Sequence, residues 1–168
     1  MSGPGTTIRP GDRAPEFSVQ GVGGGGDPLA RRVYTLAELA GQVVVLVFYP
    51  ADASPVCTAQ LAAYTNDITR FTEVGAQVLA ISPQSVGDHE QFAAANGGFA
   101  FPLLADEDRD VARRYGVPGP MGFYRRSVFV VDGAGVVRYA HRSTAGLTFR
   151  PTSELIAAVE AARSSPVQ

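Results

Sequence analysis

The sequence predicts an α/β fold in which a central mixed sheet carries helices on both faces, on three observations. Residues 43–49, "VVVLVFY", are apolar at successive positions, as in a strand buried on both faces. From there strand-like and helix-like segments alternate, which favours parallel strands joined by helices. Residues 127–132 and 136–140 form two further strand-like runs joined by "GAG", a pattern typical of an antiparallel hairpin.

The first elements follow from periodicity and turn chemistry. Phe17 and Val19 alternate at period two, which indicates a short strand. The glycine-dense residues 21–28 that follow predict a loop, because glycines have too much conformational freedom to hold an element. Thr35 and Glu38 then have the spacing of a capping box, which predicts a brief helical turn closed by Gly41.

Beyond the central strand, a helix is predicted from Pro55 to about Val74 because apolar side chains recur at helical spacing. The last helix opens at Thr152 or Ser153 and carries an apolar stripe. No long repeat or linker divides the chain, so we expect one domain over residues 1–168. The other elements are predicted as strands over 77–83 and 101–106 and as helices over 88–96, 109–117 and 153–163.

Composition excludes several classes of function. A formal net charge of -2 with a pI near 5.6 offers no electrostatic attraction to nucleic acid or to an anionic membrane. The first twelve residues contain no apolar leader, and the longest strongly apolar run, residues 43–49, is too short to span a bilayer. We therefore expect a soluble cytoplasmic protein that has no nucleic-acid partner and no membrane partner.

The chain has one cysteine, Cys57, and two histidines, His89 and His141. A single thiol cannot form an intramolecular disulfide, a CxxC redox pair or a thiolate zinc site. The histidines are far apart in sequence and lack a nearby acidic ligand pattern, so both are interpreted as surface or packing residues. No metal and no bound cofactor are expected.

Cys57 has an unusual position for a lone thiol. In "SPVC", Ser54 suits the helix N-cap and Pro55 the first helical position, which places Cys57 in the first turn. Backbone N–H groups there lack partners, and the helix dipole favours an anion by ~0.3–1 kcal/mol. That effect alone is small, so a reactive thiolate would need a cation beside it as well.

Two interpretations of Cys57 stay open on the residues alone. A lone cysteine is most often a small buried hydrophobe. A strand end that leads into a helix N-terminus is, however, where open α/β sheets place ligands and where thiols become reactive. The position therefore favours a reactive cysteine over a packing residue.

At this point the sequence resembles a known family. Pro50, Ser54 and Cys57 match the spacing of the peroxiredoxin signature, and four further segments occur in the family's order. Within the family, "SPVCT" is most similar to the bacterioferritin comigratory type, also called the Q type. The four segments are "GDRAPEF", "VVVLVFYP", "FPLLAD" and "RRSVFVVDGAGVV".

The resemblance implies a thioredoxin-like fold and a reaction in which a cysteine thiolate attacks a peroxide. Cys57 would be the peroxidatic nucleophile, Ser54 would hydrogen-bond the bound peroxide, and Pro50 would cover the pocket. Arg126 corresponds to the family's arginine, and Gln60 occupies a position where the family often has Glu or Gln. On the residues alone, a purely structural role stays open for both: Ser54 as a helix cap and Pro50 as the residue that ends a strand.

Arg125 and Arg126 could both be solvated surface charges on the residues alone. Period-two alternation sends their side chains to opposite faces, so only one can reach Cys57, and the family position selects Arg126.

The sequence also departs from the family pattern. Val56 stands where many relatives have glycine, and Ala62 stands where many Q-type members have a second, resolving cysteine. The resemblance therefore implies a one-cysteine peroxidase that reduces hydrogen peroxide and organic hydroperoxides. An external thiol, a thioredoxin-like protein or a low-molecular-weight thiol, would regenerate it, and the chain would act as a monomer or homodimer.

An alternative from another class is a thioredoxin-fold redox sensor or binding module, in which Cys57 oxidises without turnover. A dithiol oxidoreductase is a poorer alternative, because it would normally use a CxxC pair and a cis-proline before the 127–132 strand, and this chain has neither motif.

Overall fold

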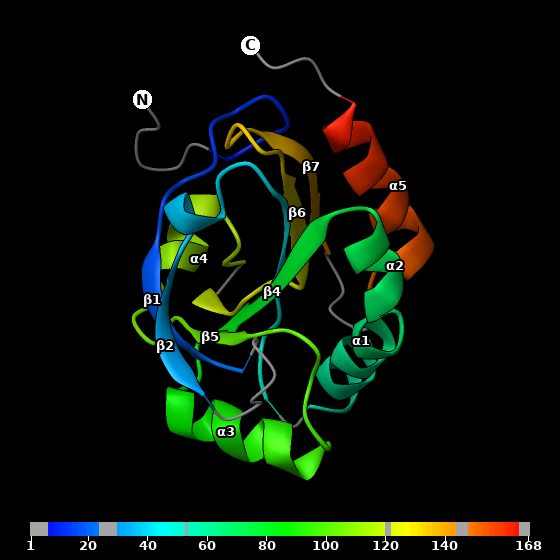
Figure 1. The fold of residues 1–168 in the computed structure, drawn as a ribbon. Coiled ribbons are helices and arrows are strands. Elements are labelled where there is room, and N and C mark those ends of the chain that lie inside the picture. The colour runs from blue at the N-terminus through cyan, green and yellow to red at the C-terminus, as the bar shows by residue number, and fades with distance from the viewer. Residues whose placement is uncertain (1–6, 24–29, 53, 120–121, 144–147, 165–168) are drawn as a thin grey trace.

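The computed structural model describes residues 7–23, 30–52, 54–119, 122–143 and 148–164. Within these residues one mixed sheet has the strand order β2-β1-β5-β4-β3-β6-β7 (Figure 1). The pairs β3–β4 and β4–β5 are parallel, and the remaining pairs are antiparallel. The strands are β1 (Ser18–Val22), β2 (Arg31–Thr35), β3 (Val43–Phe48), β4 (Ala76–Ser82), β5 (Leu103–Ala105), β6 (Ser127–Val131) and β7 (Val137–Arg142).

Helices cover both faces of this sheet, which confirms the predicted fold class (Figure 1). Helices α1, α2, α3 and α5 contribute to the apolar cluster on one face, and α4 contributes to the cluster on the other. The helical elements are η1 (Ala37–Leu39), α1 (Pro55–Asn66), α2 (Ile68–Glu73), α3 (Val86–Ala95), α4 (Asp110–Tyr115) and α5 (Thr152–Arg163).

The central strand β3 supplies both hydrophobic clusters, as its uninterrupted apolar sequence predicts. Val45 and Val47 pack on the α1 side, whereas Leu46 and Phe48 pack on the α4 side, because successive strand side chains point to opposite faces. Every residue of β3 is buried. The carboxyl end of a rigid strand therefore leads directly into the connection that precedes Cys57.

The sequence predictions missed one strand. Residues Arg31–Thr35 form β2, which pairs antiparallel with β1 at the edge of the sheet. Three of its five residues are exposed, so it lacks the apolar alternation by which strands are recognised. The adjacent helical turn is η1, where the Thr35 hydroxyl accepts a hydrogen bond from the Glu38 amide, as predicted.

The single helix predicted to run to Val74 is in fact two helices. It ends at Asn66 and resumes at Ile68, and Asp67 between them has a non-helical backbone (φ −99°, ψ 14°). Short polar side chains such as Asn and Asp compete with helical hydrogen bonding, which accounts for a break at this point.

Helix α5 is attached to the edge strand β7 by polar contacts. The Tyr139 hydroxyl donates to Glu154 Oε2 at 2.5 Å, and Arg150 Nε donates to the same oxygen at 2.7 Å. The hydrogen bond from Arg150, followed by that from Tyr139, lowers the pKa of Glu154 from 4.5 to about 2. Because the folded pKa is the lower one, the stabilisation is present above pH 4.5 and is lost as the pH falls towards 2.

Glu154→Gln should therefore flatten the loss of stability between pH 4.5 and 2, measured as the free energy of unfolding in urea. The pair is more than a third exposed, so solvent screening limits the effect to under about 1 kcal/mol. Glu160→Gln, at an exposed position of the same helix, is the matched control and should leave the acid slope unchanged. Equal slopes in all three proteins would contradict the assignment.

In the described part of the chain, no helix combines the length and the apolar character needed to cross a lipid bilayer.

Candidate active site

Cys57 lies in the first turn of α1, just beyond the carboxyl end of β3, as the sequence predicts. Ser54 is the N-cap and has the extended backbone (φ −68°, ψ 137°) expected before Pro55. Ser54 is therefore the N-cap, as predicted, although its hydroxyl makes no capping hydrogen bond. Its carbonyl instead accepts bonds from the Thr58 amide at 2.9 Å and the Thr58 hydroxyl at 2.8 Å.

Sheet register brings Arg126 to this helix start. Phe48 at the end of β3 pairs with Ser127 at the start of β6, so Arg126 lies beside the connection that leads to α1. Arg126 Nη2 donates to Cys57 Sγ at 3.3 Å. Cys57 is fully buried and Arg126 is 3% exposed. A guanidinium is therefore held against the sulfur away from bulk water, where a charge interaction is strongest.

Arg125 points the other way, as period-two alternation predicts. Its Nε donates to the carbonyl of Val117 at 3.1 Å and its Nη2 to that of Gly116 at 2.6 Å. Both carbonyls belong to the chain that leaves α4, which covers the opposite face of the sheet. The two adjacent arginines therefore serve different faces, and Arg126 is the one that contacts Cys57.

Gln60, one turn after Cys57, fixes the second arm of the guanidinium. Its Oε1 accepts from Arg126 Nη1 at 2.5 Å, and the side chain is fully buried. Among the residues that the structure describes, its amide nitrogen has no hydrogen-bond partner. The Tyr64 hydroxyl lies close to this amide, and burial raises the pKa of Tyr64 to about 12 against the lowering effect of Gln60. Cys57, Gln60 and Arg126 thus form one buried polar group.

This arrangement places a buried cation against the sulfur. A buried cation is costly unless a counter-charge or good acceptors accompany it. The guanidinium donates in a planar fork, with one N–H group to Gln60 and another to Cys57, so its orientation is determined as well as its position. Arg126 therefore supplies the cation that a reactive thiolate needs in addition to the helix dipole.

Pro50 and Ser54 lie in the connection between β3 and α1, and both are partly buried. Among the hydrogen bonds of the described residues, none joins either residue to the sulfur. The structure therefore brings Arg126, Cys57 and Gln60 into direct contact, and it places Pro50 and Ser54 on the segment that leads to them. In the described part of the chain, no cluster of three or more histidine, cysteine or carboxylate side chains could hold a metal ion.

A second polar cluster next to this site was not predicted. The Asp52 carboxylate hydrogen-bonds the fully buried His89 and the Tyr49 hydroxyl. His89 is therefore neither a surface residue nor a purely packing one. The partners are 37 positions apart in sequence, so spacing gave no signal, although a histidine on the apolar side of a helix was a clue. His141 lies half-buried on β7, and burial followed by Arg150 lowers its pKa.

Comparison with known proteins agrees with this geometry. The sequence pattern that describes the AhpC/TSA family matches residues 10–140, which include Cys57, Gln60 and Arg126. The chain belongs to the AhpC/TSA family. This match confirms the peroxiredoxin resemblance seen in the sequence. A chloroplastic peroxiredoxin Q from Oryza sativa subsp. japonica is 32% identical over 138 residues, which agrees with the Q-type assignment. That alignment covers 81% of this chain and 60% of the rice protein, so the chain spans less than two thirds of the relative's length.

Solved structures confirm the fold of this family member. AhpC of Mycobacterium tuberculosis matches with a TM-score of 0.84 and 26% sequence identity, over 95% of each chain. AhpC of Mycobacterium bovis matches with a TM-score of 0.84 and 25% identity, over 97% of each chain. The central sheet and its helices are therefore those of the thioredoxin-like fold expected from the resemblance.

Proposed function

We propose that this AhpC/TSA-family protein is a thiol-dependent peroxide reductase with Cys57 as its nucleophile. The observation that carries the proposal is the 3.3 Å contact between Arg126 Nη2 and Cys57 Sγ at the start of α1. A buried guanidinium beside a thiol in the first turn of a helix combines the two features that make a cysteine reactive. Family membership supports the same activity.

The reaction follows from these groups. The Cys57 thiolate attacks one peroxide oxygen, the O–O bond breaks, and a sulfenic acid forms on the sulfur. The other oxygen leaves with the bonding electrons and takes up a proton to become water, or an alcohol when the substrate is an organic hydroperoxide. Arg126, the Ser54 hydroxyl and the first-turn N–H groups would hold both oxygens and stabilise charge on the leaving one. Pro50 would cover the pocket.

Regeneration requires a thiol from outside the chain, because Cys57 is the sole cysteine and Ala62 occupies the position of a resolving cysteine. An external thiol would attack the sulfenic acid, release water and leave a mixed disulfide. A second thiol would then free Cys57. In this proposal the reductant is a thioredoxin-like protein or a low-molecular-weight thiol, and residues 1–168 act as one cytoplasmic domain, as a monomer or homodimer.

Stoichiometric peroxide without reductant should convert Cys57 to a sulfenic acid that dimedone traps. Excess peroxide should add a second and a third oxygen, because no second thiol in the chain can capture the intermediate. Intact-mass spectrometry measures each addition directly. An unmodified thiol after peroxide treatment would refute the proposed function.

A second experiment, on turnover, distinguishes the peroxidase from the alternative function, a redox sensor with little turnover. Steady-state peroxide loss is measured with thioredoxin and with several low-molecular-weight thiols in turn. Multiple turnovers with any one of them support the enzyme. Oxidation of Cys57 in a single round, with no sustained turnover under any reductant, would favour the sensor.

A further inference from the structure

The connection between β3 and α1 is held by polar groups that the proposed chemistry does not use. The Asp52 carboxylate accepts from the Tyr49 hydroxyl at 2.7 Å through Oδ1 and contacts His89 Nδ1 at 2.8 Å through Oδ2. Tyr49 follows β3, whereas His89 lies in α3. His89 is fully buried, and the Asp52 side chain is 8% exposed. Asp52 is thus attached to an element that has no other evident part in the site.

The bonding pattern identifies this contact as a hydrogen bond between His89 and Asp52. His89 Nε2 lies 2.9 Å from the carbonyl oxygen of Leu104, which can only accept, so this nitrogen carries a proton. The contact between Nδ1 and Oδ2 needs a second proton, because a carboxylate oxygen also only accepts. His89 and Asp52 therefore share one proton in this contact, and both ring nitrogens of His89 are engaged.

The backbone of Asp52 is held as well. Its amide donates to Gln84 Oε1 at 3.0 Å, and the Ser82 hydroxyl donates to the same oxygen at 3.1 Å. Ser82 ends β4, so these bonds attach Asp52 to the neighbouring strand. Residue 52 is thus fixed through both its main chain and its side chain.

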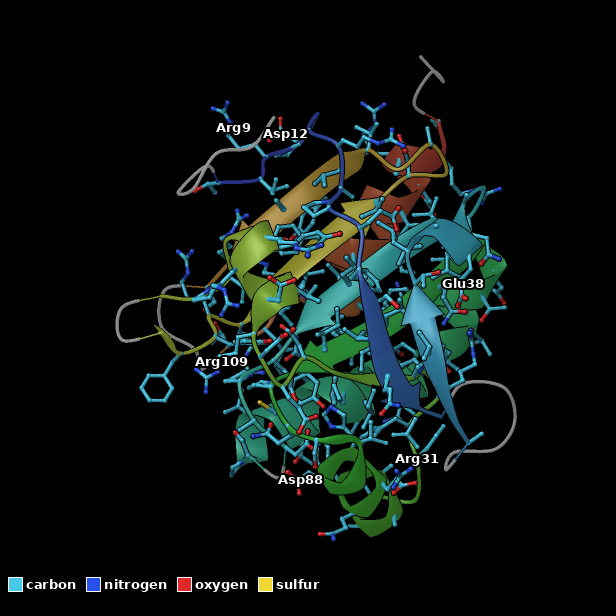
Figure 2. All side chains as sticks on the ribbon, turned by 90° about the vertical axis from the view of Figure 1, so that its left-hand side faces the viewer. Arg9, Asp12, Arg31, Glu38, Asp88 and Arg109 are labelled. Carbon is cyan, nitrogen blue, oxygen red and sulfur yellow. The ribbon has the colours of Figure 1, made fainter. Side chains whose placement is uncertain are left out.

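Helix α3, which supplies His89, is also tied to the edge of the sheet. Arg31 of β2 donates through Nε to Glu90 of α3 at 2.8 Å, and Figure 2 shows Arg31 beside this helix. That pair is largely exposed and adds little stability by itself. Burial of Val86, Phe92 and Ala93 in the apolar cluster is what holds α3, and with it His89, against the sheet.

We propose that Asp52 and His89 are positioning residues that hold the connection carrying Pro50 and Ser54 in the geometry required for attack by Cys57. Asp52 stands midway between Pro50 and Ser54, so a shift at residue 52 moves both. A buried polar pair is not an efficient source of stability, because desolvation offsets most of its attraction. A defined conformation is what such a pair supplies here. This inference rests on the proposed function, since it concerns the same reaction.

Two isosteric variants of His89 provide the test. In His89→Asn the side-chain amide nitrogen takes the place of Nδ1 and keeps the bond to Asp52. In His89→Gln it takes the place of Nε2 and keeps the bond to Leu104. Both variants lose one hydrogen bond and the imidazole ring, so a general effect on the fold should be similar in the two. We expect the second-order rate of Cys57 oxidation to fall by roughly tenfold or more in His89→Gln and to be largely retained in His89→Asn.

Asp52→Ala tests the same pair from the other partner. Asp52 lies in the connection between β3 and α1, so this substitution leaves α3 unchanged. It should slow oxidation at least as much as His89→Gln does, because it also removes the hydrogen bond from Tyr49. The double variant should be no slower than Asp52→Ala, because that single variant has already lost the contact with His89. Hydrogen exchange of the backbone amides of residues 51, 52, 54 and 56–58 should be faster in Asp52→Ala and in His89→Gln. This readout does not depend on activity, and thermal midpoints are measured alongside.

Equal slowing in His89→Asn and His89→Gln would overturn the proposal in favour of a merely structural role. Unchanged rates in all variants would also overturn it, and a faster rate would identify the pair as a barrier to peroxide entry instead. Failure of the unsubstituted protein to react with peroxide would refute the proposed function. In that case the exchange measurement would still decide whether Asp52 and His89 hold the connection.

Discussion

Replacement of Cys57 by serine is expected to reduce peroxide consumption to the rate of the protein-free blank. A serine hydroxyl stays protonated at neutral pH and is a weak nucleophile without an adjacent base. The change is nearly isosteric, and the hydroxyl oxygen can still accept a hydrogen bond from Arg126 Nη2, which donates to the sulfur at 3.3 Å in the native protein. Activity should therefore disappear while the fold survives. Steady-state peroxide loss and far-ultraviolet circular dichroism measure the two properties.

The control is a measurement that Cys57→Ser is folded, so that a loss of activity cannot come from unfolding. Thermal unfolding of Cys57→Ser should remain cooperative, with a midpoint within a few degrees of that of the native protein, because about 1 kcal/mol corresponds to roughly 2–8 °C at this size. A folded variant that still consumes peroxide would remove Cys57 from the mechanism. The proposed function would then fall with it, since no other thiol exists in the chain.

Arg126→Lys is expected to slow Cys57 oxidation by roughly a hundredfold while preserving much of the thiolate. The guanidinium uses one arm for Gln60 and another for the sulfur, whereas an ammonium is a point charge that has no such fork. Ionisation can account for only about thirtyfold of the reactivity, since a free thiol is already a few per cent ionised at neutral pH. Most of the loss should therefore come from orientation. Stopped-flow oxidation rates and thiolate absorbance across pH measure the two contributions.

Arg125→Lys is the matched control, because it makes the same chemical change one residue away on the opposite face. Arg125 bonds the carbonyls of Gly116 and Val117, so its replacement should lower the free energy of unfolding and leave the oxidation rate intact. Equal losses of rate in both variants, or a loss in neither, would show that Arg126 does not orient the peroxide. The helix start would then be the only source of activation.

Elements whose sequences obey local rules are predictable from the amino-acid sequence alone. The buried strand β3, the hairpin of β6 and β7, and the start of α1 at Pro55 follow from apolar runs, turn residues and helix capping preferences. The strand β2 was missed because it lies at the sheet edge with mostly exposed side chains, and pairing with β1 rather than its own pattern makes it a strand. The break at Asp67 was missed because apolar spacing continues across it.

The same division holds for the site. The sequence by itself determined that Cys57 lies at a helix N-terminus after a buried strand, and alternation alone separated Arg125 from Arg126. Only the tertiary structure decided that Arg126 contacts the sulfur, that Gln60 holds its other arm, and that Asp52 meets His89. These contacts join residues 37 to 69 positions apart. Local propensity acts over a few residues, whereas such contacts depend on strand register and on which helix packs on which face, and no short segment contains that information.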